Sequence, residues 1–147
     1  MSKNSTIDLK IAGIKSGSQT YQVAWQINHS FDMQMAMNLD WKVSMENKAE
    51  SEHMHFFQTF EDVELNWHLV QNKGTLTPLF NSKPLFDYFF ICEGDDIYGY
   101  FERAIEAIKN NDRIDGIYPF HFSLVKKQNQ FLSNLKNTKQ YIESLHV

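Results

Sequence analysis

The sequence predicts an α+β fold, a two-layer sandwich in which a mostly antiparallel sheet of about six strands carries two helices on one face. Three observations lead to this prediction. The chain has 147 residues, 42% of them hydrophobic and 22% charged, which suits one domain with its own core. Several segments alternate between apolar and polar residues, and two others have helical apolar spacing. We assign the domain to residues 1–125 and a C-terminal helical extension to residues 126–147.

The first strand and the first helix are predicted near the N-terminus. Residues 7–11 alternate between apolar and polar side chains, which predicts a strand, and Gly13 and Gly17 break the run. Ser18 can cap a helix, because its hydroxyl accepts a hydrogen bond from a free N–H of the first turn. Apolar residues at helical spacing then predict a helix over residues 19–31.

The rest of the domain contains the other predicted strands and the second helix. Alternation predicts strands over 39–43, 53–60 and 65–70, a continuous apolar run predicts a central strand over 85–92, helical spacing predicts a helix over 97–108, and a last strand is predicted over 117–125. Asp95 or Asp96 can cap that helix. Short loops in the middle make the sheet mostly antiparallel, and a right-handed crossover through the first helix would make the topology distantly ferredoxin-like.

The C-terminal extension has its own character. Its apolar residues follow a spacing of four and three residues, which gives a narrow apolar seam on a polar helix. The seam consists of Phe131, Leu135, Thr138, Ile142 and Leu145. We interpret it either as a surface that packs on the chain's own domain or as a surface that docks on a partner, with Phe131, Leu135, Ile142 and Leu145 as the docking residues.

Charge and composition exclude several classes of protein. The net charge of −4 and the pI of about 5.8 argue against a protein that coats nucleic acid, so direct nucleic-acid binding is not expected. One cysteine rules out an internal disulfide, and no apolar signal segment or membrane-length stretch is visible, which predicts a cytoplasmic protein without a membrane role. The aromatic content of 14% indicates an aromatic core or an exposed docking patch.

The segment from Asp87 to Gly94 resembles the defining region of a bacterial family, the IPExxxVDY proteins. It has the order Asp87-Tyr88-Phe89-Phe90-Ile91-Cys92-Glu93-Gly94, with a proline loop at Pro78 before it and a helix after it. The resemblance covers residues 7–131 and implies a small cytoplasmic bacterial protein without an established activity. Its motif positions here are Pro78, Asp87, Tyr88, Glu93 and Gly94. The sequence departs from the motif at Thr77-Pro78-Leu79, where Ile-Pro-Glu is expected.

Three histidines form the best candidate metal site. His53 and His55 lie two residues apart on a predicted strand and therefore project from the same face. His68 lies on the next strand and could be a third ligand, and imidazole suits zinc, copper or nickel. The alternative is that these histidines belong to a polar strand face in contact with solvent.

Two further residues could have chemical roles. Cys92 could be a nucleophile, but its apolar strand favours a buried thiol with a raised pKa. Asp87 interrupts an apolar segment, so it is either a polar anchor in a pocket or a structural hydrogen-bond acceptor. Glu93, Asp95 and Asp96 are better explained by helix capping than by cation binding.

These observations favour a non-catalytic interaction or regulatory module. Its partner would be another protein or a second copy of the chain, and no cofactor is expected. The alternative is a small-molecule- or metal-binding domain that uses His53, His55 and His68. An enzyme is the least favoured interpretation, because no nucleotide-binding loop, nucleophile elbow or paired-cysteine motif is present.

Overall fold

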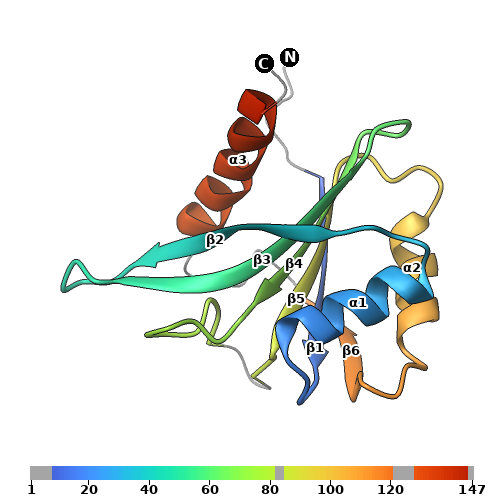
Figure 1. The fold of residues 1–147 in the computed structure, drawn as a ribbon, viewed down its shortest axis with the longest axis horizontal. Helices are drawn as coiled ribbons and strands as arrows, with labels where there is room; N and C mark the ends of the chain where they lie inside the picture. The colour runs from blue at the N-terminus through green and yellow to red at the C-terminus, as the bar shows by residue number, and fades with distance from the viewer. Residues whose placement is uncertain (1–7, 82–84, 121–127, 146–147) are drawn as a thin grey trace.

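The computed structural model describes residues 8–81, 85–120 and 128–145, with the side chains of the last helix described over 130–138. The elements are β1 (Leu9–Lys15), α1 (Thr20–Ser30), β2 (Ala36–Ser44), β3 (Glu50–Phe60), β4 (Leu65–Gln71), β5 (Tyr88–Glu93), α2 (Tyr100–Ile108), β6 (Gly116–Pro119) and α3 (Gln128–Leu145) (Figure 1). Each predicted helix and strand has a counterpart, although residues 121–125 of the last predicted strand lie outside the described residues. The α+β prediction is therefore confirmed.

The six strands form one sheet with the order β2-β3-β4-β5-β1-β6, and each pair of neighbours is antiparallel. The chain enters at β1 in the interior of the sheet, crosses through α1 to β2 at the far edge and returns strand by strand to β5. A ferredoxin-like β-α-β-β-α-β unit has two strands between its helices. This chain has four strands there, so a hairpin is added to that pattern.

Helices α1 and α2 cover one face of the sheet, as predicted. Their buried residues form one apolar cluster with the side chains of that face, including Trp67 and Phe90, whose rings stack at 5.4 Å. The helical members are Val23, Ala24, Ile27, Phe101, Ala104 and Ile108. Asp96 stabilises the start of α2 by accepting hydrogen bonds from the N–H groups of Tyr100 and Phe101, both at 2.8 Å.

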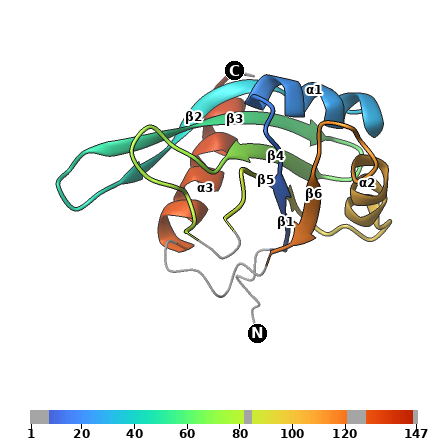
Figure 2. The ribbon, with the colours of Figure 1, turned by 90° about the horizontal axis from the view of Figure 1, so that it is seen from below.

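Helix α3 lies on the opposite face of the sheet and adds a third layer there (Figure 2). Phe131 and Leu135 are buried in a second apolar cluster with Trp41, Phe80 and Phe89. The described part of the seam thus packs on the chain's own sheet, as the first of the two interpretations expects. Phe131 and Leu135 are therefore not exposed to a partner. The side chains of Ile142 and Leu145 lie outside the described residues.

Two local expectations differ from the structure. β1 continues through Gly13 instead of ending there, because the glycine lets the ring of Phe86 lie against the strand; a Cβ at this position would be 2.4 Å from that ring. Gln19 rather than Ser18 is the N-cap of α1, and its N–H donates to the Gln22 side chain at 3.1 Å. None of the described helices is long and apolar enough to cross a membrane.

Candidate functional site

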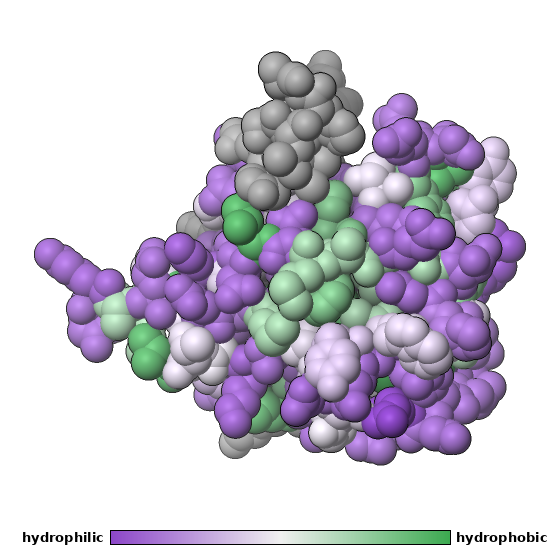
Figure 3. All heavy atoms as spheres, viewed as in Figure 1, coloured by the Kyte–Doolittle hydropathy of each residue, from purple (hydrophilic) through white to green (hydrophobic). Residues whose placement is uncertain are grey.

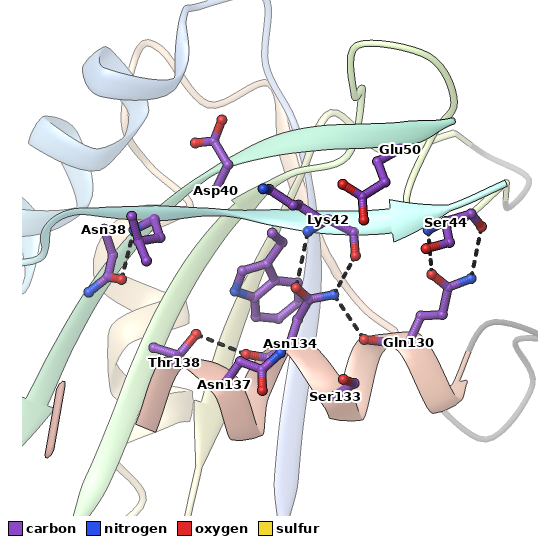
Figure 4. Close-up of a pocket in the computed structure, with 12 residues that line it drawn as sticks. Asn38, Asp40, Lys42, Ser44, Glu50, Gln130, Ser133, Asn134, Asn137 and Thr138 are labelled. Atoms are coloured by element: carbon purple, nitrogen blue, oxygen red, sulfur yellow. Dashed lines mark hydrogen bonds between the residues drawn. The ribbon is translucent and has the colours of Figure 1, made fainter. Parts of the chain in front are cut away.

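The candidate site lies where α3 meets the outer edge of the sheet. β2 is an edge strand, because β3 is its one neighbour in the sheet. Two amide side chains of α3 bind its backbone (Figure 4). Asn134 accepts a hydrogen bond from the Lys42 N–H at 3.1 Å and donates one to the Lys42 carbonyl at 3.0 Å. Gln130 makes the same pair of bonds with Ser44, at 2.6 and 3.2 Å.

This match depends on the two repeat lengths. Residues four apart on a helix rise by about 6 Å. Residues two apart on a strand are separated by about 6.7 Å. Amides at positions 130 and 134 can therefore bond two successive outward-facing residues of β2, much as a neighbouring strand would. An exposed strand edge is a site of unwanted pairing, and α3 protects this part of it.

The protection ends in a groove. A β-bulge between Asn38 and Trp41 shifts β2 out of register. One turn beyond Asn134, the Thr138 hydroxyl donates back to the Asn134 carbonyl at 2.9 Å instead of reaching the strand. A groove of about 690 Å³ runs along this edge, lined on the sheet side by residues 38–42, Ser44 and Glu50 and on α3 by Gln130, Ser133, Asn134, Asn137 and Thr138. Its volume falls within the usual range for ligand sites.

Acidic side chains give the groove a negative character. Asp40 and Glu50 line it, together with Lys42 (Figure 4). Partial burial raises the pKa of Asp40, and the nearby Glu52 carboxylate acts in the same direction, while His53 and Lys42 oppose them. A cation entering the groove would relieve this repulsion.

The floor of the groove lies against the histidines. Trp41 lines the groove but is only 1% exposed, and its Nε1 has no hydrogen-bond partner among the described residues. Its ring lies 5.2 Å from the ring of His55, 5.9 Å from that of His68 and 5.2 Å from that of Phe131, measured between centroids. Trp41 thus separates the groove from a polar cluster in the core.

That cluster contains the three predicted metal ligands, and all three are fully buried. The alternative that these histidines lie on a solvent-facing strand face is therefore wrong, because α3 and the loop after β4 cover them. His55 Nε2 and His68 Nδ1 are hydrogen-bonded to each other at 2.9 Å, and His53 Nδ1 donates to the Gln71 carbonyl at 2.9 Å. Among the described residues, no group of three or more His, Cys, Asp or Glu side chains is arranged to hold a metal ion. The geometry gives a histidine pair in place of a three-ligand site.

Burial controls the charge of His55 in this pair. Desolvation lowers the pKa of His55 well below its usual value, and the neighbouring His68 lowers it further, against a smaller opposing effect of the Leu39 backbone. On the other side of the pair, His68 Nε2 lies 3.7 Å from a Glu93 carboxylate oxygen. Asn66 donates a hydrogen bond to the same carboxylate at 3.3 Å. The cluster is a buried polar network in which His55 is neutral near pH 7.

The motif residues have structural contacts. The Asp87 carboxylate accepts the Ser16 N–H at 2.9 Å, and the Tyr88 hydroxyl donates to the Ser18 carbonyl, so both hold the loop before α1. Gly94 has φ +129 and lies under the Glu64 carbonyl, where a Cβ would be 2.7 Å away. Pro78 pairs with Lys73 in an isolated β-bridge.

Cys92 is almost fully buried on the α1–α2 face of the sheet. Desolvation raises the pKa of its thiol to about 12, and nearby carboxylates, Asp96 first, add to the effect. A thiol in this state is not a reactive nucleophile.

Three important residues were not identified from the sequence. Asn134 and Gln130 bind the strand edge, and the signal was their i, i+4 spacing beside the apolar seam. Asn72 is buried and holds the loop after β4 through hydrogen bonds with the backbone of Phe80 and Phe86. Nothing in the local sequence distinguishes Asn72 from an ordinary turn residue.

Comparison with known proteins gives no relative for this chain: no protein-family model, curated protein or solved structure matches it. The resemblance to the IPExxxVDY proteins stays a prediction. The functional interpretation therefore depends on the geometry described above.

Proposed function

We propose that this chain is a non-catalytic protein-interaction module that binds an extended, basic segment of a partner protein in the groove between β2 and α3. One observation carries the proposal. Helix α3 bonds the β2 edge at Lys42 and Ser44 but, among the described residues, forms no such bond with residues 38–40, and the groove that runs beside the contact continues there. An extended segment could add to the sheet there through backbone hydrogen bonds, although not to the Leu39 N–H, which already donates to the Asn38 side chain at 2.7 Å. Strand addition is a common mode of peptide recognition.

The surroundings of the groove support this kind of ligand. The Asp40 and Glu50 carboxylates suit Lys or Arg side chains on the partner. Leu39, which lines the groove and is 58% exposed, offers an apolar contact. Figure 3 shows apolar side chains gathered over β2, within a largely polar surface.

Selection from a library of displayed random peptides tests the proposal directly. We expect enriched peptides to be extended and to carry Lys or Arg. Asn137→Trp would fill the groove from an exposed position of α3, and Asp40→Lys would reverse its charge. Each variant should weaken peptide binding by about tenfold or more, the equivalent of roughly 1.4 kcal/mol. Lys136→Trp is the matched control, because it adds the same bulk to an exposed position of α3 outside the groove.

Two results would contradict the proposal. One is that no peptide is enriched. The other is that enriched peptides bind the Asn137→Trp variant as well as they bind the Lys136→Trp control. If the occupant is a second copy of the chain, sedimentation velocity would show a dimer that Asn137→Trp dissociates.

A further inference from the structure

Helix α1 carries an aromatic slot on its outer surface, away from the groove. Tyr21 and Trp25 lie one helical turn apart, so their rings project from the same side, and they are 55% and 59% exposed. His29, one turn further, stacks on Trp25 with ring centroids 5.1 Å apart and planes inclined by 4°. This stacking holds the indole in place, which reduces the entropy that a ligand must remove on binding.

Polar side chains close the slot on one side. A hollow of about 290 Å³ is lined by Tyr21, Gln22, Trp25, Gln26 and Arg113. A second hollow of about 430 Å³ adjoins it, shares Gln26 and Arg113, and extends over residues 110–112. The first volume is close to the lower limit for small-ligand sites.

Apart from the Tyr21 hydroxyl, the polar groups of the first hollow that are left for a ligand are hydrogen-bond donors, whereas the adjoining hollow adds the Asp112 side chain. The Gln22 side-chain oxygen already accepts the Gln19 N–H, and the Gln26 side-chain oxygen accepts a bond from Asn111. The amide NH₂ groups of both glutamines are therefore the ends left to face a ligand. Arg113 forms none of the ion pairs found among the described residues, and its guanidinium bonds the Ser18 hydroxyl at 3.5 Å.

We infer that this slot binds a nucleoside phosphate. The base would stack on Trp25 and Tyr21, because base–aromatic stacking accepts any base and needs an exposed ring. The phosphate would lie on Arg113 and the two glutamine amides, since a planar guanidinium binds phosphate oxygens in pairs. The slot is on the α1 face of the sheet and the peptide groove is at the β2–α3 edge, so this inference does not depend on the proposed function.

Tryptophan fluorescence provides a selective test. Trp41 and Trp67 are 1% and 0% exposed, so quenching by a stacked base reports on Trp25. The probes are AMP, adenosine, inorganic phosphate and benzoate. We expect saturable quenching by AMP at millimolar or lower concentration, with adenosine and phosphate each binding about tenfold more weakly. AMP should also raise the melting temperature, because it binds the folded state.

Variants assign the two parts of the ligand. Arg113→Gln should weaken AMP binding about tenfold and leave adenosine binding unchanged. Trp25→Ala should abolish the AMP-dependent shift in melting temperature. Lys48→Gln is the charge control, because it removes an exposed cation on the β2–β3 turn. Arg113 and Trp25 are both exposed, so the Arg113→Gln and Trp25→Ala proteins should fold.

Three outcomes would overturn the inference: no saturable effect of millimolar AMP, AMP binding that Arg113→Gln does not weaken, or benzoate binding as tight as that of AMP. The last outcome would assign the slot to aromatic carboxylates instead of nucleotides.

Discussion

Replacement of Asn134 by Ala should open the sheet edge at Lys42. The change removes two hydrogen bonds, at 3.1 and 3.0 Å, between the Asn134 amide and the Lys42 backbone, and a third that the same amide donates to the Gln130 carbonyl at 2.9 Å. Two such bonds contribute about 1–3 kcal/mol together. Water can replace them because Lys42 is exposed, and Ala favours the helix by up to about 0.7 kcal/mol relative to Asn. We therefore expect the free energy of unfolding to fall by only about 1 kcal/mol.

The local effect should be larger than the global one. Amide hydrogen exchange at the Lys42 N–H should accelerate by about tenfold or more, because the bond that protects it is lost. Urea unfolding measures the global loss. Asn134→Asp keeps an acceptor for the Lys42 N–H but cannot donate to the carbonyl, so it should give an intermediate exchange rate. Lys136→Ala, a change at an exposed position, should leave the exchange rate of the Lys42 N–H unchanged. Exchange at Lys42 that is unchanged in Asn134→Ala would refute the idea that this amide covers the edge.

Four further predictions concern the core. Phe131→Ala should lower the free energy of unfolding by about 3–5 kcal/mol in urea titrations, because a fully buried ring is lost. The pKa of His55 is lowered below 6.5 in the folded protein, so its contribution to stability should be complete above pH 6.5 and should be lost as the pH falls toward the folded-state pKa. In His55→Gln, the melting temperature should depend less on pH over that range. With a thiol pKa of about 12, Cys92 should react with a disulfide reagent in native protein no faster than unfolding exposes it. Gly13→Ala should cost about 1–3 kcal/mol in thermal melts because its Cβ would overlap the Phe86 ring, whereas Gly17→Ala, whose Cβ meets no atom within 4 Å, should cost less.

The sequence was sufficient for the elements but not for the layers. Alternation located β2, β3 and β4, and helical spacing located all three helices, because both patterns are local. The same alternation placed His53 and His55 on one polar face of β3. The two residues do share a face, but the expected exposure of that face to solvent was wrong. That face is buried by α3, whose contacts come from more than 70 residues further along the chain: Gln130 bonds Ser44, a separation of 86 residues. Alternation along a strand carries no information about a helix that lies so far along the sequence and packs on that face.

The candidate site was missed for a related reason. A lone Asn or Gln on a polar helix face is normally a solvated residue, and the meaning of Asn134 depends on a strand edge at matching distance. The apolar seam was visible, but its partner could be another protein or the same sheet. Burial of Phe131 and Leu135 on this sheet answers that question for the first two turns of the seam.

The contact between α3 and the sheet needs both its apolar and its polar parts, for different reasons. The amide bonds lie at an exposed edge, where about 1 kcal/mol each is comparable with the entropy lost when one side chain and its backbone become ordered. They could not hold an 18-residue helix by themselves. Burial of Phe131 and Leu135 supplies that energy, but apolar packing alone has little directional preference. The paired amides fix the register, since a shift of the helix by one residue would break all four bonds. Loss of Phe131 should therefore release the helix, whereas loss of both amides should leave it bound in more than one register.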